Sequence, residues 1–463
     1  MATTTTTETP NMSAKTLEVW LSGIHVGTLS QVQGHLSFSY AAAWLASGAA
    51  SSLSQSLPLS DQPFDDGATR PFFAGLLPEG GKRRLIAQTL QVSRQNDFAL
   101  LDSLGGECAG AVTLLEPGDT PPAPDAPSAV RWLDAPQLLA VLDELPLRPM
   151  LAGDEGLRLS LAGAQDKLPV VAERAEGESA EGAEEGKIGL PLYGAPSTHI
   201  LKPPIQGVDG SVFNEGFCMA LAQALKLDVA KTQIRHVDSH VLSGQAGQRD
   251  YLLVARYDRQ AGLPSQRLHQ EDFCQALGVA PETKYQSEGG PDLAQAFALL
   301  RHATRPSAPQ TLKLLDFVVF NALIGNHDAH GKNFSLLYTA KGVVLAPLYD
   351  ALCTAVYPAL TDKMAMKIGS KYKFSEVQAR HWAQFATQAG LSPAQVKKRI
   401  LALAKRLPQL AHATLASFEA DGNNHPVLEQ IVTLIEQRCA LTIRRLTASA
   451  AEDKEDAIVN IAI

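Results

Sequence analysis

The sequence predicts an α+β protein in which a strand-rich lobe precedes an all-helical lobe, with an additional small α/β domain in front of both. Alternating apolar and polar residues, the period of a half-buried strand, occur near the start and again in the second quarter of the chain. From Leu268 the pattern is helical almost to the end. A chain of 463 residues is long enough for two or three domains.

The front domain is predicted over residues 15–118. Leu17, Val19 and Leu21 alternate with Glu18 and Trp20, which indicates a strand that ends at the Ser-Gly pair 22–23. The Thr-rich residues 1–14 before it are predicted to be a disordered tail. A Pro-rich break at 116–124 follows the domain, so residues 119–150 are assigned to a linker and a connecting helix.

The second unit, residues 151–260, is predicted to be the strand-rich lobe. Its strand-like segments are residues 157–161, 168–171, 198–202 and 251–256. One helix interrupts them, because apolar residues recur every four positions at Phe213, Phe217, Leu221 and Leu225. The acidic, Gly- and Ala-rich insert at 173–187 is expected to be a flexible hairpin loop.

The third unit, residues 261–448, is predicted to be helical. Ser392 followed by Pro393 is typical of a helix start and opens a helix over 394–407. A second helix begins at His425-Pro426 and runs through Leu446. Residues 449–463 are predicted to be a flexible tail.

Composition limits the classes of function. The net charge of −8, with 45 % hydrophobic and 19 % charged residues, indicates a globular protein and argues against a surface that binds nucleic acid throughout. Five scattered cysteines without a C-x-x-C pair indicate a reducing compartment and exclude a Cys-based zinc ribbon. The uncharged stretch 19–60 has no apolar run long enough to span a membrane, and no signal peptide is apparent. We therefore expect a cytoplasmic protein without a membrane partner.

A polar loop between two apolar elements carries the clearest functional signal. The loop follows an apolar helical segment and contains Asp328, Lys332 and Asn333. Four residues separate Asp328 from Asn333, as in the catalytic loop of protein kinases, where the Asp accepts the substrate hydroxyl proton and the Asn holds a metal ion. Lys332 could offset charge on the transferred phosphoryl group.

A second carboxylate, Asp350, ends the apolar strand-like stretch 343–350. In kinases an Asp in this position binds Mg²⁺ that bridges the nucleotide phosphates. Two carboxylates within about 4 Å would repel each other by roughly 4 kcal/mol at an effective dielectric constant of 20. The pair Asp328 and Asp350 therefore predicts either Mg²⁺ or a raised carboxyl pKa.

The histidines of the same loop leave another interpretation open. His327, Asp328 and His330 could begin a zinc site, but only two histidines lie close together and no H-E-x-x-H motif is present. Orientation of the loop by both histidines is the simpler interpretation.

Upstream residues could complete a nucleotide site. The small residues of 160–167 would let backbone N–H groups approach phosphates, although a single glycine makes this signal weak. Lys202 ends a predicted strand where a kinase lysine contacts the α- and β-phosphates, and Glu215 on the next helix is its possible ion-pair partner. Residues 254–259 form a plausible hinge between the lobes whose backbone would contact adenine.

In combination these motifs resemble the HipA family of serine/threonine kinases, toxins of type II toxin–antitoxin systems. The resemblance covers about residues 15–445 and rests on residues 76–80, 160–167, 199–202, 267–272, 325–333 and 349–350. It implies a two-lobed protein-kinase-like fold with a HipA-type N-terminal domain. It also implies Asp328 as catalytic base, and Asn333 and Asp350 as Mg²⁺ ligands. The ATP-binding residues that it implies are Ala162, Gly163, Ala164, Gln165, Asp166, Lys167, Lys202, Ala255, Arg256, Tyr257, Gln270, His330, Lys332, Asn333, Tyr349 and Asp350.

The resemblance further implies the regulation, the protein target and the partners of such a kinase. Ser160 matches the serine that family members autophosphorylate, which displaces the phosphate loop and switches the site off. Family members phosphorylate aminoacyl-tRNA synthetases and pair with a HipB-like helix-turn-helix antitoxin, and operator DNA is then contacted mainly through that antitoxin. Two alternatives stay open: a small-molecule phosphotransferase of similar fold and a non-catalytic co-repressor module.

Overall fold

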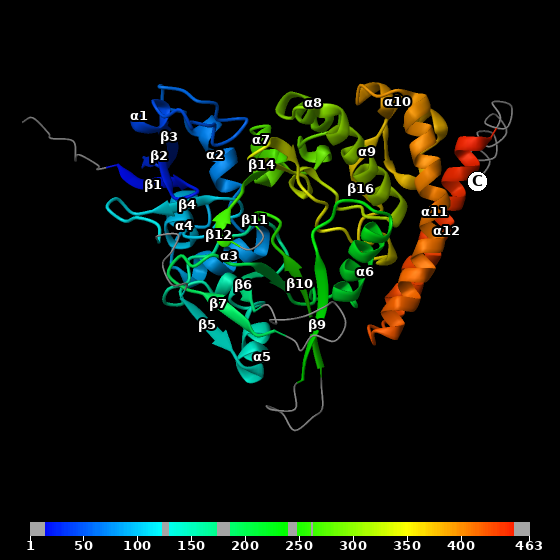
Figure 1. Ribbon diagram of the computed structural model, residues 1–463, viewed down its shortest axis with the longest axis horizontal. Coiled ribbons are helices and arrows are strands. Elements are labelled where there is room, and N and C mark those ends of the chain that lie inside the picture. The colour runs from blue at the N-terminus through cyan, green and yellow to red at the C-terminus, as the bar shows by residue number, and fades with distance from the viewer. Residues whose placement is uncertain (1–13, 123–128, 174–185, 239–247, 261–262, 449–463) are drawn as a thin grey trace, which may run out of the picture.

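The computed structural model describes residues 14–122, 129–173, 186–238, 248–260 and 263–448. Residues 1–13 and 449–463 of the two predicted tails, and residues 174–185 of the predicted acidic insert, lie outside the described residues. Figure 1 shows three regions: an N-terminal domain, a strand-rich lobe below it and a helical lobe beside both. The exact domain limits given above stay predictions.

The N-terminal domain is an antiparallel sheet covered by short helices. Its strand order is β3-β2-β1-β4, with Leu17 of β1 paired to Leu29 of β2, as the alternation predicts. The buried side of the sheet packs on α2 and α4. The elements are β1 (Lys15–Leu21), β2 (Ile24–Val32), β3 (His35–Tyr40), α1 (Ala42–Leu45), α2 (Asp66–Ala74), α3 (Gly80–Thr89), α4 (Asp97–Leu104) and β4 (Val112–Leu115).

The strand-rich lobe is a six-stranded antiparallel sheet with the order β5-β7-β6-β8-β10-β9. Its apolar side packs on α5, and α6 lies between the sheet and the helical lobe. The elements are β5 (Val130–Leu133), α5 (Ala135–Glu144), β6 (Leu168–Ala172), β7 (Ile188–Pro191), β8 (His199–Lys202), α6 (Ser211–Ala224), β9 (Thr232–Asp238) and β10 (Gln248–Ala255). The predicted stripe from Phe213 to Leu225 is buried in α6 and at its end.

Two predictions about this lobe need correction. The segment 119–150 contains the expected helix, α5, but it does more than connect two domains, because β5 forms an edge strand of the sheet and α5 contributes Leu138 and Leu142 to the core. Residues 157–161 do not form a strand of the sheet. Their backbone bonds instead to Glu107 of the N-terminal domain, which accepts from Ser160 N at 2.9 Å and donates to Arg158 O at 2.8 Å. The entry to the predicted phosphate loop is thus attached to the N-terminal domain.

The helical lobe contains the largest buried core. Its helices are α7 (Phe273–Ala276), α8 (Leu293–Ala303), α9 (Ser307–Ile324), α10 (Ala379–Gln388), α11 (Pro393–Ala420) and α12 (Pro426–Thr447). The predicted helix starts at Pro393 and Pro426 are confirmed. Helix α11 continues beyond the predicted end at Leu407, through Pro408, because Leu407 and Ala411 are buried in the core it shares with α12.

The prediction of an all-helical lobe is wrong in one respect: short sheets are inserted between its helices. The predicted catalytic loop begins at the end of α9 and leads into β14 of the three-stranded sheet β13-β14-β15, so strand pairing fixes where that loop ends. The strands are β11 (Arg259–Gln260), β12 (Leu263–Arg267), β13 (His269–Asp272), β14 (Ser335–Thr339), β15 (Gly342–Leu345), β16 (Lys363–Ile368) and β17 (Lys371–Lys373). Short 3-10 turns lie at Pro149–Leu151, Pro281–Thr283, Gln286–Glu288, Gly331–Asn333, Thr354–Val356 and Phe374–Glu376. In the described part of the chain, no helix has the length and apolar character needed to cross a membrane.

Candidate active site

One cavity of about 570 Å³ brings together most of the predicted site residues. It is lined by residues from all three regions. The predicted residues that line it are Ala162, Gly163, Ala164, Gln165, Lys167, Lys202, Glu215, Ala255, Arg256, Tyr257, Gln270, Asp328, His330, Lys332, Asn333, Tyr349 and Asp350. Asp166 and Ser160 are not among the lining residues.

The loop that carries Asp328 follows the C-terminal end of α9. Gly325 ends the helix with a φ of +80°, and Asn326 then turns the chain by accepting from the Asp328 amide at 3.0 Å. The Asp328 side chain accepts a hydrogen bond from the Tyr285 hydroxyl at 2.5 Å. Burial raises the pKa of Asp328 above its ordinary value, against the lowering effect of this hydrogen bond. A buried carboxyl with a raised pKa is a suitable group to accept a proton near neutral pH.

Asp350 contacts Asn333, the last residue of this loop. The Asn333 Nδ2 atom donates to Asp350 Oδ2 at 3.2 Å. The backbone of Asp350 has a φ of +57°, a left-handed conformation that costs energy in a residue other than glycine and tends to occur at functional sites. Burial alone would raise the pKa of Asp350, but Lys202 and Lys167 hold it well below its ordinary value. Asp350 is therefore a carboxylate at neutral pH.

Lys202 of β8 is held between two carboxylates. Its Nζ atom lies 2.6 Å from Glu215 Oε1 on α6 and 2.5 Å from Asp350 Oδ1. Lys202 and Glu215 are both buried. Burial alone would lower the pKa of Lys202, but Asp350 and Glu215 raise it above its ordinary value, so the ammonium stays charged. The sheet and α6 thus present one fixed cation to the cavity.

The loop 160–167 forms another part of the cavity wall. Gly163 has a φ of +112°, a backbone conformation that residues with a side chain rarely adopt, so this position favours glycine. A Cβ atom there would lie 2.6 Å from Lys167 Nζ, and the end of that flexible side chain would have to move. Lys167 donates to the Ala162 carbonyl at 2.8 Å. Asp166 instead pairs with Lys82 of α3 at 2.5 Å. Ser160 is fully buried, and its hydroxyl donates to the Leu76 carbonyl at 2.8 Å.

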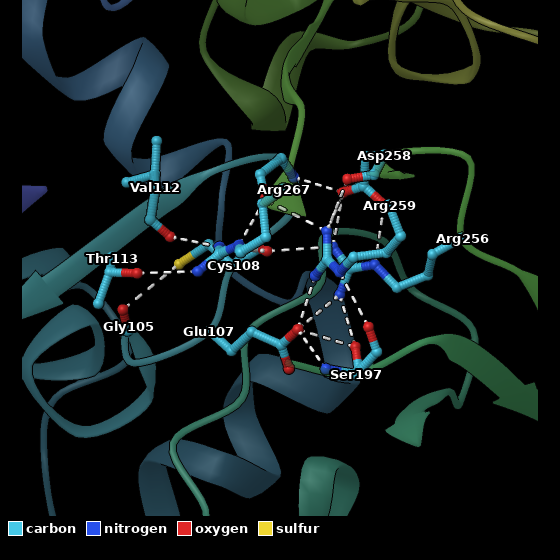
Figure 2. A network of polar contacts seen from close by, with 11 residues as sticks. Gly105, Glu107, Cys108, Val112, Thr113, Ser197, Arg256, Asp258, Arg259 and Arg267 are labelled. Carbon is cyan, nitrogen blue, oxygen red and sulfur yellow. Dashed lines mark hydrogen bonds and ion pairs between the residues drawn. The ribbon is translucent and has the colours of Figure 1, made fainter. Parts of the chain in front are cut away.

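The hinge after β10 is anchored to the N-terminal domain by a buried polar network. Figure 2 shows Glu107 surrounded by Ser197 and the guanidinium groups of Arg256 and Arg259. Arg256 also lies 2.7 Å from Asp258, and Asp258 accepts from the Gly110 amide at the same distance. Because Arg256 and Asp258 line the cavity, the network fixes the hinge relative to the site.

Aromatic and basic residues complete the cavity. The rings of Tyr257 and Tyr349 lie 5.6 Å apart, and the Tyr349 hydroxyl donates to the Lys332 carbonyl at 2.7 Å. Lys332 is buried and pairs with Asp272 at 2.7 Å. Burial alone would lower the pKa of Lys332, but Asp272 and Glu79 raise it, so this cation also stays charged.

Sequence reasoning missed several residues of the cavity, among them Glu79, Lys284 and Tyr285. Glu79 belongs to the segment 76–80, which was noted only for the family resemblance. Tyr285 lies 43 residues before Asp328, the residue that it contacts. No local pattern marks such pairs, because only the tertiary fold brings them together.

The loop histidines do not form a metal centre. His327 bonds through Nδ1 to the Thr361 carbonyl at 2.9 Å, and the His330 ring packs against Tyr285. Burial lowers the pKa of His330 to about 3, so it is neutral. Among the described residues there is no group of three or more His, Cys, Asp or Glu side chains that could hold a metal ion.

A magnesium nucleotide needs fewer protein ligands than a zinc site: oxygen atoms for the metal and positive charges for the phosphates. The residues of the cavity fit both requirements. Asn333 donates through its nitrogen, which leaves its amide oxygen available, and Asp350 supplies carboxylate oxygens. Mg²⁺ prefers oxygen ligands and is commonly held by one or two protein groups together with substrate phosphates and water. Lys167 and Lys202 lie in the same cavity and could balance phosphate charge.

Comparison with known proteins agrees with this geometry. Residues 17–115 match the HipA N-terminal domain, and residues 159–411 match the HipA-like C-terminal domain. A protein of Sinorhizobium fredii named "Putative kinase Y4mE" is 47% identical over 396 residues, which cover 84% of this chain and 89% of that protein. The serine/threonine-protein kinase toxin HipA of Shewanella oneidensis is 29% identical over 85% of this chain and 88% of its own length.

A solved structure shares the fold. It is the complex of HipA, HipB and operator DNA from Shewanella oneidensis, with a TM-score of 0.75 and 26% identity over 93% of this chain and 98% of the matched chain. The expected two-lobed α+β fold of the kinase type is thereby confirmed. The chain belongs to the HipA family of serine/threonine-kinase toxins.

Proposed function

We propose that this protein is an ATP- and Mg²⁺-dependent protein serine/threonine kinase that acts as a growth-inhibiting toxin. One observation carries the proposal: a single cavity contains Asp328, the contacting pair Asn333 and Asp350, and the ion pair of Lys202 with Glu215. Protein kinases need a base, a metal-binding pair and a phosphate-binding lysine in one place.

Each residue then has a specific task. When bound, MgATP supplies the γ-phosphoryl group, and the metal offsets its charge. Asp328 accepts the proton of the acceptor hydroxyl as that oxygen bonds to phosphorus and the bond to the ADP oxygen breaks. Lys202 and Lys167 bind and orient phosphate oxygens. Lys332, fixed by Asp272, stabilises negative charge that develops during transfer.

Ser160 is the proposed site of autophosphorylation. Its hydroxyl is fully buried against Leu76, so the loop 160–167 must leave the N-terminal domain before phosphate can be added. A phosphate carries about −1.5 to −2 charges and has no room in this buried position. The modified loop would then stay displaced and could no longer bind ATP, which would switch the enzyme off.

The proposed partner is a HipB-like helix-turn-helix antitoxin. The HipA of Shewanella oneidensis, which matches 93% of this chain and 98% of its own, is solved in a complex with HipB and operator DNA. The net charge of −8 favours DNA contact mainly through the antitoxin. The proposed target is an aminoacyl-tRNA synthetase in the cytoplasm, because phosphorylation of such an enzyme would stop tRNA charging and growth.

The proposal is tested with purified protein and MgATP. We expect wild type to gain one phosphate at Ser160, measured by intact mass and peptide mapping, and Asp328→Asn to gain none. Phosphoproteomics after expression without antitoxin should then identify a synthetase serine that is modified by wild type alone. Nucleotide binding without transfer would indicate a non-catalytic co-repressor module, and transfer only to small molecules would indicate a phosphotransferase. Either result would contradict the proposal.

A further inference from the structure

One segment of the N-terminal domain, residues 75–82, contributes Gly75, Leu76 and Glu79 to the wall of the cavity. The segment contacts the phosphate loop on one side: the Glu79 amide donates to the Gly163 carbonyl at 3.1 Å, and Lys82 pairs with Asp166 at 2.5 Å. On the other side the Gly75 carbonyl accepts from Lys332 at 3.1 Å. The segment therefore bridges the loop that would hold phosphate and the loop that carries Asp328.

Within this segment, Glu79 faces two lysines of the helical lobe. Its Oε2 atom lies 2.8 Å from Lys284 Nζ, and its Oε1 atom lies 3.7 Å from Lys332 Nζ. The Glu79 side chain is only 13% exposed, and Oε1 is buried without a hydrogen-bond partner among the described residues. Glu79 also lines the cavity. Its carboxylate is thus not a surface ion pair but part of the cavity wall.

The two lysines depend on Glu79 to different extents. Lys332 has a second carboxylate, Asp272, at 2.7 Å. For Lys284, Glu79 is the only carboxylate within 4.0 Å in the part of the chain that the structure describes. Lys284 precedes Tyr285, whose hydroxyl contacts Asp328 at 2.5 Å. Loss of the Glu79 charge would therefore leave Lys284, the residue before Tyr285, without a carboxylate partner among the described residues.

We propose that Glu79 is a positioning residue of the kinase site, and that the N-terminal domain thereby completes the catalytic centre. This inference rests on the proposed function. A lysine has a long flexible stem, and the partner of its ammonium group decides where the charge lies. Charges that are fixed before reaction need no rearrangement when negative charge develops on the phosphoryl group. Glu79 fixes Lys284 directly and adds a second contact to Lys332.

The test compares Glu79→Gln, which keeps the shape and removes the charge, with Glu79→Asp, which keeps the charge. In the MgATP phosphorylation assay, kcat is the rate constant for transfer of the one phosphate to Ser160 at saturating ATP, and KM is the ATP concentration that gives half of that rate. We expect Glu79→Gln to lower kcat about tenfold with little change in KM for ATP, because fixed charges act on the transition state. Glu79→Asp should recover part of the loss. Glu18→Gln is the matched control, because Glu18 contacts His25 within the N-terminal sheet, and it should behave as wild type.

A double variant separates positioning from general damage. Lys284→Met should show a loss similar to that of Glu79→Gln, and the double variant should lose no more than either alone, because the two residues act as one unit. Equal kcat values for Glu79→Gln and wild type would overturn the inference. Losses that multiply in the double variant would also overturn it. So would a kcat loss in Glu79→Gln that is accompanied by a lower thermal unfolding midpoint than that of wild type, because the loss would then reflect general damage to the fold. A wild-type protein without transfer activity would contradict the proposed function itself, and the inference with it.

Discussion

The hydroxyl of Tyr285 lies 2.5 Å from Oδ1 of Asp328 and donates a hydrogen bond to it. This contact joins the segment after the turn Pro281–Thr283 to the loop after α9, two parts of the helical lobe that are far apart in sequence. It affects both properties that a catalytic base needs. The bond orients the carboxylate, and it favours the charged form against the burial that raises the pKa of Asp328.

Tyr285→Phe removes this bond without removing the ring. We expect kcat/KM for phosphoryl transfer at pH 7 to fall roughly fivefold, since a net hydrogen bond is worth about 1 kcal/mol. The hydrogen bond lowers the pKa of Asp328, so its loss should raise that pKa and move the acidic limb of the pH–rate profile to higher pH. Tyr193→Phe, at a residue that is 63% exposed, is the control. An unchanged acidic limb would show that Tyr285 does not act on Asp328.

Gly163→Ala tests the phosphate loop. A Cβ atom at this position would meet Lys167 Nζ at 2.6 Å, in a backbone conformation that residues with a side chain rarely adopt. We expect the variant to fold but to bind ATP about tenfold more weakly, since strain of this kind costs on the order of 1–3 kcal/mol. Isothermal titration with ATP measures the change. Gly48→Ala, where no atom lies within 4 Å of the added carbon, should bind as wild type does.

The sequence was sufficient for the parts of the site that local patterns encode. The interval from Asp328 to Asn333, the strand that ends at Lys202 and the helix stripe that carries Glu215 are local features, and the structure places all of these residues around one cavity. Their chemical roles stay predictions. The hydrophobic periodicity likewise predicted β1 and α6, because burial of one face dictates that pattern. The starts of α11 and α12 were predicted from local start signals, a proline at the first helical position in each case.

What the sequence did not reveal depends on contacts between distant segments. The apolar residues of 157–161 looked like a strand, but their backbone partner is Glu107 of another domain. Asp166 looked like part of the phosphate loop, yet Lys82 of α3 holds it outside the cavity lining. The helix predicted to end at Leu407 continues through Pro408, because packing between α11 and α12 outweighs the local preference of proline.

Glu215→Gln tests the ion pair with Lys202. The substitution keeps a hydrogen-bond acceptor for Lys202 but removes the charge of Glu215. Asp350 is then the one carboxylate of the two that still pairs with Lys202. We expect KM for ATP to rise about tenfold, because hydrogen bonds between charged groups contribute about 1.5–3 kcal/mol. Steady-state kinetics over a range of ATP concentrations measures the change. Glu419→Gln, on the exposed side of α11, is the control. Wild-type KM in Glu215→Gln would show that Asp350 alone is sufficient to hold Lys202.

The buried network around Glu107 predicts how stability depends on pH. Burial alone would raise the pKa values of Glu107 and Asp258, but Arg256 and Arg259 hold both below their ordinary values. A carboxyl whose pKa is lower in the folded state contributes stability above its unfolded pKa of about 4 and loses that contribution as the pH falls. We therefore expect the free energy of unfolding to decrease steeply with acidification below about pH 4.5. Urea denaturation from pH 3.5 to 7 measures it.

Glu107→Gln isolates the contribution of this network. At pH 7 we expect a loss of about 3–5 kcal/mol, because the arginines that surround Glu107 remain buried after one partner is removed. The decrease in stability below pH 4.5 should become shallower, since one of the two titrating carboxyls is gone. Glu116→Gln, nine positions further on and exposed, should keep the wild-type curve. If Glu107→Gln kept the full acid dependence, the arginines would not be lowering the pKa of Glu107, and the hinge would be held by its other contacts, those of Asp258 with Arg256 and Gly110.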